Sequence, residues 1–213
     1  MIDQKKDAFK TEQEKFWAGA FGDEYCDRNR DNELVGGNLA RFAQTFRAAG
    51  GFESVLECGA NVGLNLIALH QLFPSAKLAA IEINEKAVAA LRELGFVDVT
   101  HASLLDHVPS RTYDIVFTSG VLIHIAPEGL PKVYDLMYKA SARWVAIAEY
   151  YDPKPVEIPY RGHAQRMYKR DFAGEILDRF PDLRLVDYGF TYHRDPSYKH
   201  DDLTWFLMEK RPR

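Results

Sequence analysis

The stretch Ser54-Val55-Leu56-Glu57-Cys58-Gly59-Ala60-Asn61-Val62-Gly63-Leu64-Asn65 decides how this chain folds. It begins with a short apolar segment, turns at a glycine and continues into the apolar run Leu66-Ile67-Ala68-Leu69. This order predicts a buried strand, a tight turn and a helix. Gly59 permits the sharp turn, and Gly63 removes a side chain where helix, strand and ligand crowd together. The free N–H groups at the start of the helix then face whatever binds above the turn.

A second acidic residue extends this pattern. Glu82 ends the apolar segment Lys77-Leu78-Ala79-Ala80-Ile81, which reads as a second strand. In nucleotide-binding α/β units, an acid about 20 residues after the glycine turn binds the hydroxyl groups of a ribose. A glycine pair alone is a weak signal, but strand, turn, helix, strand and acid together indicate a nucleoside site.

This combination resembles the class I S-adenosylmethionine (SAM) methyltransferases. A dinucleotide-binding domain is the competing interpretation, and two features argue against it. The spacing is Gly59-x-x-x-Gly63 rather than Gly-x-Gly-x-x-Gly, and Glu57 stands at the strand end just before the turn. A carboxylate there repels a pyrophosphate but not a cationic sulfonium amino acid.

The resemblance implies the fold and the cofactor. The expected fold class is α/β, a Rossmann-like class I methyltransferase fold. It has a seven-stranded mixed sheet, an antiparallel C-terminal hairpin and helices on both faces. The expected cofactor is SAM, as methyl donor or as the substrate itself, with no metal. We expect residues 1–33 to form an N-terminal helix and lid segment, and residues 34–213 to form the SAM-binding domain.

Composition and charge narrow the partners. The chain has 213 residues, of which 46% are hydrophobic and 27% charged, as in ordinary globular proteins. With a net charge of -4 and no block of Lys or Arg, nucleic acid is not an expected partner. Cys26 and Cys58 form no disulfide framework, and the sequence shows no signal peptide or membrane span. We therefore expect a cytoplasmic protein with a small-molecule substrate, no nucleic acid and no membrane; its oligomeric state is open.

The N-terminal segment has two interpretations. Residues Asp3 to about Ala20 read as a charged helix, whereas Phe21 to Arg30 mixes aromatic and charged residues at no regular period. This second part is either a structural loop or a lid that closes over the cofactor. In a lid, Tyr25 would face the sulfonium, and Arg28 or Asn29 would bind a carboxylate or amide.

The remaining elements follow from apolar runs and turn residues. Tyr150 to His163 follows a strand and contains Pro153, Pro155 and Pro159, so we expect a long rigid loop with specificity residues. The other expected helices are Leu34 to Ala49, Leu64 to near Pro74, Glu85 to Leu94, one opening at Pro127, and Asp171 to Phe180. The other expected strands are Phe96 to Ser103, Tyr113 to Ser119, Arg143 to Glu149, Leu183 to His193 and Leu203 to Lys210.

The resemblance also implies which residues bind the cofactor. Many relatives carry an acid where Ser103 stands, so Ser103 is either an adenine contact or an ordinary turn residue. The candidate cofactor-binding residues are Glu57, Gly59, Ala60, Asn61, Gly63, Asn65, Glu82, Ile83, Ser103, Leu104, Ser119 and Gly120.

Stretches outside the cofactor motif resemble a narrower group, labelled pseudaminic-acid-biosynthesis-associated methylases. They are Phe16-Trp17, Phe21 to Asn29, Glu149 to His163, Asp187 to Phe190 and Asp201 to Phe206. Small enzymes that convert SAM to azetidine-2-carboxylate have the same overall architecture. The resemblance therefore implies use of SAM more firmly than it implies a reaction.

Three functions remain open from the sequence: methyl transfer to a sugar or other small biosynthetic intermediate, cyclisation of SAM to azetidine-2-carboxylate and methylthioadenosine, and non-catalytic SAM binding. Both reactions need desolvation and placement more than acid–base work, and aromatic faces can steady the sulfonium. His124 is a general base or a structural histidine. The candidate catalytic residues are Tyr25, Asn29, Tyr150 and His124, and the candidate substrate-binding residues are Trp17, Phe21, Arg28, Tyr151, Tyr160, Arg161, His163 and Arg166.

Overall fold

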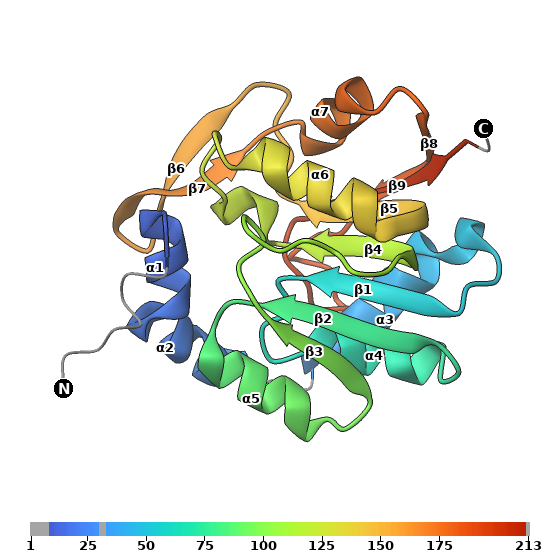
Figure 1. The fold of residues 1–213 in the computed structure, drawn as a ribbon, viewed down its shortest axis with the longest axis horizontal. Helices are drawn as coiled ribbons and strands as arrows, with labels where there is room; N and C mark the ends of the chain where they lie inside the picture. The colour runs from blue at the N-terminus through green and yellow to red at the C-terminus, as the bar shows by residue number, and fades with distance from the viewer. Residues whose placement is uncertain (1–8, 30–32, 212–213) are drawn as a thin grey trace.

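The computed structural model, which describes residues 9–29 and 33–211, is built on a seven-stranded mixed sheet (Figure 1). The strand order is β3-β2-β1-β4-β5-β9-β8. Neighbouring strands from β3 to β5 pair in parallel, and β9 runs antiparallel to both β5 and β8. The bounds are β1 Ser54–Cys58, β2 Lys77–Glu82, β3 Val97–His101, β4 Tyr113–Ser119, β5 Ser141–Glu149, β8 Leu183–Phe190 and β9 Thr204–Lys210. The predicted fold class is confirmed, including the parallel pairing of the strands that carry Glu57 and Glu82.

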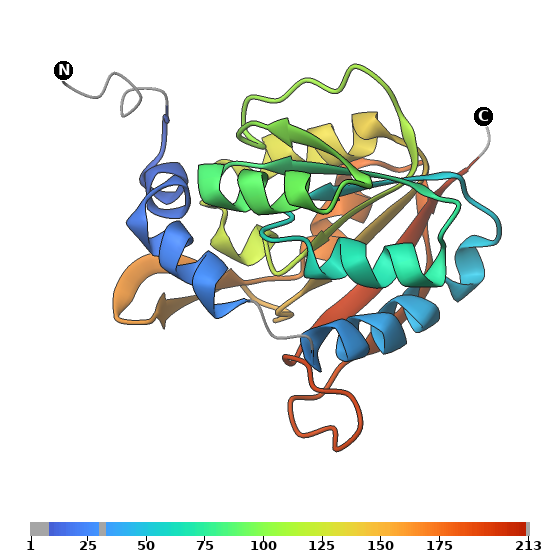
Figure 2. The same cartoon turned by 90° about the horizontal axis from the view of Figure 1, so that it is seen from below.

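Helices cover both faces of the sheet (Figure 2). Val55 and the other β1 and β2 residues of one face pack with α3 (Glu33–Thr45), α4 (Leu64–Leu72) and α5 (Glu85–Glu93). Leu56 and its neighbours on the other face pack with α6 (Leu130–Ala140) and α7 (Phe172–Arg179). Because both faces are buried, the central strands are nearly continuous apolar runs, which is the pattern the sequence shows.

A cover stands across the carboxyl ends of the parallel strands (Figure 1). It consists of α1 (Glu12–Ala18), α2 (Ala20–Arg28) and a separate hairpin of β6 (Val156–Tyr160) and β7 (His163–Lys169). The sequence did not predict a helix in the described part of Phe21 to Arg30. Residues of α2 contact two different surfaces, Phe21 the hairpin and Cys26 the sheet edge, so no single apolar face marks the helix.

Two other expectations are corrected. Tyr150 to His163 is not a single rigid loop, because it contains β6. Pro159 fits in that strand because β6 is an edge strand, and its pairing with β7 shifts register between Ile158 and Tyr160. Helix α6 begins at Leu130 rather than Pro127, because the Gly129 N–H closes a turn on the Ala126 carbonyl at 2.8 Å.

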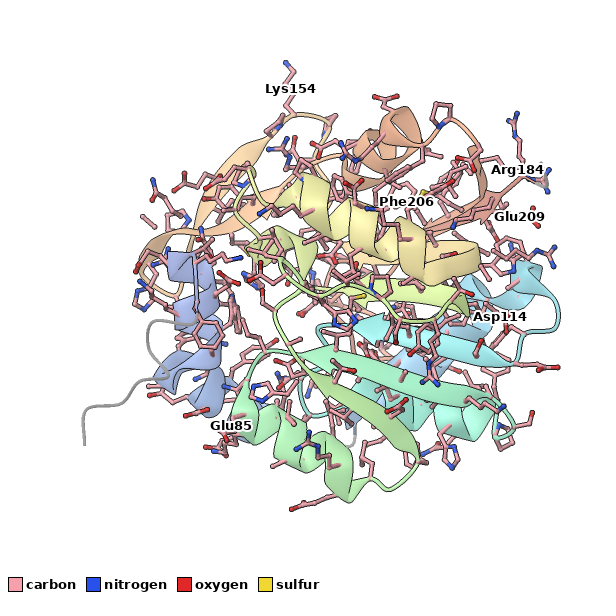
Figure 3. All side chains as sticks on the ribbon, viewed as in Figure 1. Glu85, Asp114, Lys154, Arg184, Phe206 and Glu209 are labelled. Atoms are coloured by element: carbon pink, nitrogen blue, oxygen red, sulfur yellow. The ribbon has the colours of Figure 1, made fainter. Side chains whose placement is uncertain are left out.

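Charged contacts hold the opposite end of the sheet (Figure 3). Asp114 accepts the N–H groups of Glu53 at 2.8 Å and Ser54 at 2.9 Å, which fixes the start of β1 against β4. Glu209 on β9 accepts hydrogen bonds from the guanidinium groups of Arg143 and Arg184. In Figure 3 the labelled side chains Asp114, Arg184 and Glu209 lie at the end away from α1. These groups stabilise the scaffold and leave the carboxyl end of the sheet for a binding site.

Within residues 9–29 and 33–211, no helix is long and apolar enough to cross a membrane. Cys26 and Cys58 are both buried free thiols.

Candidate cofactor and active site

A cavity of about 400 Å³ lies between the carboxyl ends of β1, β2 and β4 and the cover. Glu57 from β1, Glu82 from β2 and the Ser119–Gly120 turn after β4 all line it. Small-molecule sites in proteins typically measure roughly 300–1,000 Å³. In the part of the chain that the structure describes, no group of three or more His, Cys, Asp or Glu side chains is arranged to hold a metal ion.

The glycine turn is shaped by positive φ angles and by close packing. Gly59 has φ +80° and Gly63 φ +87°, a region that favours glycine. A Cβ on Gly59 would lie 2.7 Å from Val121 Cγ2, and one on Gly63 would lie 2.8 Å from Leu91 Cδ2. The fold of the turn therefore favours glycine at both positions.

Glu82 is a buried carboxylate held by backbone N–H groups. Oε2 accepts the Asn61 N–H at 2.7 Å, and Oε1 accepts the N–H groups of Ile83 and Asn84 at 2.8 Å each. Burial raises the pKa of Glu82, while these three hydrogen bonds lower it. A carboxylate has about four acceptor positions. Glu82 therefore keeps capacity for a hydroxyl donor of a ligand.

Glu57 has one oxygen without a partner. Its side chain is fully buried; Oε1 accepts a hydrogen bond from Asn65 Nδ2 at 2.6 Å, and Oε2 has no partner among the described residues. Burial raises the pKa of Glu57 to about 8, although Asn65 and Arg41 act in the opposite direction. A buried unpaired carboxylate oxygen is costly. This oxygen fits a donor, above all a cationic one, on a bound ligand.

A buried arginine, Arg41, is connected to Glu57 through the side chain of Asn65. Arg41 is 3% exposed, and burial lowers its pKa to about 10. Its Nη2 donates to Asn65 Oδ1 at 2.9 Å, and its Nε donates to His200 Nε2 at 3.0 Å. The network therefore links Glu57, through Asn65 and Arg41, to the segment between β8 and β9.

Aromatic rings form the wall of the cavity on the side of the cover. The Trp17 ring lies 5.3 Å from the Tyr25 ring, 4.6 Å from the His124 ring and 6.4 Å from the Tyr160 ring, measured between centroids. Burial raises the pKa of the Tyr25 hydroxyl, so this group stays neutral at neutral pH. The rings offer flat, desolvated faces of the kind that attract a cation.

His124 has the environment of a structural histidine. Its Nδ1 lies 2.6 Å from the Arg166 carbonyl oxygen, and a carbonyl only accepts, so Nδ1 carries the hydrogen. Burial lowers the pKa of His124 to about 4. The neutral imidazole packs between Trp17 and Tyr160 and joins the cover to the sheet. This geometry favours the structural interpretation over a general base.

The inner side of the cover is fixed to the loop after β2. Asn84 Nδ2 donates to the Trp17 carbonyl at 3.1 Å and to Asp23 Oδ1 at 2.9 Å. Asn84 Oδ1 also caps α5 by accepting the Ala87 N–H at 2.9 Å. One side chain therefore connects the Glu82 loop, the start of α5 and the cover.

Gly22 provides a test of this docking. A Cβ on Gly22 would lie 1.9 Å from the Trp17 carbonyl oxygen and 2.8 Å from Asn84 Nδ2. Gly22→Ala is expected to cost about 1–3 kcal/mol of docking free energy, as overpacking does. Hydrogen exchange across α2 should accelerate by roughly 5- to 150-fold. Gly36→Ala is the matched control, because a Cβ on that helical glycine meets nothing within 4 Å; equal α2 exchange in the two variants would contradict tight docking.

The structure separates the predicted site residues into two groups. All of the predicted cofactor-binding residues line the cavity, as do Tyr25, Asn29, Tyr150, His124, Trp17 and Tyr160. Phe21, Arg28, Tyr151, Arg161, His163 and Arg166 do not line it. The rings of Phe21 and His163 lie 6.0 Å apart, behind the aromatic wall. The Arg28 guanidinium lies over the rings of Phe21 and Tyr25. Tyr151 is 43% exposed.

Several lining residues were missed by sequence reasoning: Glu14, Asn38, Asn84, His200 and Asp201. They come from segments whose approach to the cavity depends on tertiary packing. Asp201 interacts with the Tyr150 hydroxyl and raises its pKa, although burial is the larger cause. The spacing Thr11-x-x-Glu14 is a capping-box signal, and it could have marked the start of α1.

Part of the sequence is similar to a known protein family. Residues 55–142 match the family described as "Methyltransferase domain". The sequence of the chain matches no curated protein.

Solved methyltransferases share the fold over nearly the whole chain. One is magnesium protoporphyrin IX methyltransferase from Synechocystis PCC 6803 with bound SAM, with TM-score 0.67, 16% identity and coverage of 95% of this chain and 99% of that one. Another is the plantazolicin methyltransferase BpumL with a pentazolic desmethylPZN analog and S-adenosylhomocysteine (SAH), with TM-score 0.65, 11% identity and coverage of 94% and 95%. N-methyltransferase NodS from Bradyrhizobium japonicum WM9 has TM-score 0.61, 16% identity and coverage of 89% and 99%. At these identities, the likeness shows a shared fold.

Proposed function

We propose that this chain, which carries a methyltransferase domain on a methyltransferase fold, is a SAM-dependent enzyme that acts on a small molecule. The observation that carries the proposal is that two acidic side chains, Glu57 and Glu82, line the same cavity. Glu57 presents an unpartnered buried oxygen, and Glu82 presents a carboxylate with acceptor capacity left. A molecule that joins a cation to a ribose satisfies both groups.

Each part of SAM has a matching surface. Glu82 would accept hydrogen bonds from the ribose hydroxyls, and Glu57 would pair with the ammonium of the amino-acid part. The faces of Trp17 and Tyr25 would lie against the sulfonium. When bound, SAM supplies an electrophilic methyl carbon. The contribution of the chain is to align that carbon and to keep water away from it.

Methyl transfer to a small biosynthetic intermediate, such as a sugar, is the reaction we favour. Tyr150 and Asp201 also line the cavity, and the Tyr150 hydroxyl interacts with the Asp201 carboxylate. These groups could hold a hydroxyl or amine of an acceptor and take up the proton that it loses. The resemblance of the cover segments to the pseudaminic-acid-associated group supports a sugar-like acceptor.

A second reaction, cyclisation of SAM, is favoured by the size of the cavity. Its volume of about 400 Å³ leaves little room for a second molecule beside SAM. In this reaction the amine nitrogen of the substrate bonds to its own γ-carbon. The bond from that carbon to sulfur breaks with its electron pair going to sulfur, methylthioadenosine leaves, and the nitrogen loses a proton to solvent. The products are azetidine-2-carboxylate and methylthioadenosine.

One experiment separates the possibilities. The protein is incubated with SAM alone, and the products are identified by mass spectrometry. Azetidine-2-carboxylate together with methylthioadenosine would establish cyclisation, whereas methyl transfer requires SAH to appear only when an acceptor is added. Tight binding of SAH without turnover of any acceptor would indicate a binding protein. Failure to bind either SAM or SAH would contradict the proposed function as a whole.

The ribose contact gives a direct binding prediction. Glu82→Ala should weaken SAH binding by about 1–3 kcal/mol, the loss expected for charge-assisted hydrogen bonds. Calorimetry should therefore show roughly 5- to 150-fold lower affinity. Glu93→Ala, which removes an exposed acid from the same region of the chain, should leave affinity unchanged. Equal affinities of the two variants would contradict the role of Glu82.

A further inference from the structure

We infer that Glu14, on helix α1 of the cover, selects the purine base of the bound cofactor by accepting a hydrogen bond from its exocyclic amine. The inference rests on the proposed use of SAM. It assigns base recognition to a helix outside the sheet, at a point where the sequence offered Ser103 and Leu104.

The end of β3 lies within reach of a base whose ribose is held by Glu82. Glu82 pairs in register with His101, and the Ala102 N–H donates to the Glu82 carbonyl at 3.0 Å. A nucleoside held at its ribose by Glu82 therefore reaches the residues that follow β3. The cavity wall there is largely apolar, which suits a flat aromatic base; its lining includes Ile83, Ala102, Leu104 and Leu105.

Glu14 and Ser103 form a hydrogen-bonded polar pair at this end of the cavity. Glu14 is 6% exposed, and its Oε1 accepts the Ser103 hydroxyl at 2.5 Å. Ser103 Oγ is itself held by the Leu105 N–H at 3.1 Å. Asp106, the neighbouring acid, has a side chain that is 38% exposed and is paired with Lys10. Glu14 is therefore the buried carboxylate at this place.

The two carboxylate oxygens of Glu14 have different hydrogen-bond partners. Oε2 accepts the N–H groups of Lys10 at 2.9 Å and Thr11 at 2.8 Å, together with the Thr11 hydroxyl at 3.0 Å. These contacts form the capping box of α1 and hold the side chain in place. Among the described residues, Oε1 accepts only the Ser103 hydroxyl and so retains acceptor capacity. A fixed carboxylate can accept an N–H but cannot donate.

Discrimination between bases follows from this asymmetry. Adenine presents an amino group at its 6-position, which Glu14 can accept. Hypoxanthine presents a carbonyl oxygen at the same position, so two acceptors would face each other without a hydrogen bond. Glu14 lies on α1, and α1 is part of the cover. The cover must therefore be docked on the sheet for Glu14 to contact the base.

The test compares binding of SAH with binding of S-inosylhomocysteine, which differs by the 6-amino to 6-oxo change. We expect the wild-type protein to prefer SAH by about tenfold or more. Glu14→Gln should reduce this preference at least severalfold, because the amide can donate to the 6-oxo group while glutamine still supports a capping box. Glu12→Gln, an exposed acid on the same helix paired with Lys15, should leave the preference unchanged.

Two further variants keep the test independent of helix stability. Ser103→Ala leaves Glu14 in place and should retain the preference for SAH. In the double variant Glu14→Gln, Ser103→Asp, a carboxylate returns to nearly the same position and should restore the preference. An unchanged ratio in Glu14→Gln, or loss of the ratio in Ser103→Ala alone, would overturn the inference. Since the readout is a ratio, it differs from failure of the proposed function, in which neither ligand binds.

Discussion

Trp17→Ala is expected to weaken SAH binding by roughly 30- to 100-fold and to accelerate hydrogen exchange across α2. Truncation of a buried aromatic side chain costs about 3–5 kcal/mol. Trp17 is partly exposed, so we expect about 2–3 kcal/mol, with tenfold in affinity for each 1.4 kcal/mol. The loss falls on the cover because Trp17 joins α1 and α2 to His124 and to Tyr160 of the hairpin.

The matched control keeps an aromatic ring. Trp17→Phe preserves a flat face against His124 and Tyr25, and it removes an indole N–H that has no partner among the described residues. Its affinity for SAH should fall less than tenfold. Exchange in β1 and β4 should stay as in the wild type in both variants, because the sheet core does not contain Trp17. Wild-type affinity in Trp17→Ala would show that the cover takes no part in binding.

The second large effect concerns pH. The affinity of the wild-type protein for SAH should rise by close to tenfold between about pH 6 and pH 7, and more slowly from pH 7 to pH 8 as the Glu57 pKa is approached. In the free protein, burial raises the pKa of Glu57 to about 8, so the side chain is protonated at neutral pH. Pairing with the ligand ammonium lowers that pKa, and binding then releases a proton. Release of a proton on binding means that affinity increases with pH until Glu57 is already ionised in the free protein.

The variant Glu57→Gln separates the effect of Glu57 ionisation from other causes of pH dependence in SAH binding. The ammonium of the ligand itself titrates near pH 7.7–8.0, as free α-amino groups do. Because that titration is common to both proteins, the ratio of wild-type to Glu57→Gln affinity should rise with pH, and calorimetry in two buffers should detect proton release only in the wild type. A ratio that does not vary with pH would mean that Glu57 keeps one protonation state throughout.

The raised pKa of Glu57 also predicts how the folding stability depends on pH. Since the pKa of Glu57 is raised on folding, its contribution to stability is full below the unfolded value of about 4.3 and is lost as pH rises through about 8. The melting temperature of Glu57→Gln should therefore rise relative to wild type between pH 6 and pH 9. A constant difference across that range would contradict the raised pKa.

The sequence alone determined the sheet and the side of the cavity that β1 and β2 form. Strand, glycine turn, helix and acid lie within one continuous segment, so local apolar periodicity and the spacing of Gly59, Gly63 and Glu82 were enough to predict them. The same holds for the antiparallel pair at the C-terminus, whose strands are long and close in sequence. These parts were predictable because their contacts are between neighbours along the chain or along a parallel βαβ unit.

Only the tertiary structure decided what faces the cavity from the cover. Glu14 meets Ser103 across 89 residues, and Arg41 meets His200 across 159. Such approaches depend on how α1, α2 and the hairpin pack on the sheet edge, and no local pattern encodes that packing. For the same reason Phe21 and His163, though aromatic and in the expected segments, pack behind the wall, whereas Trp17 and Tyr160 line the cavity. The periodicity of residue types along a helix or strand shows which face of that element a side chain lies on. Which other element packs against that face is decided by the tertiary structure.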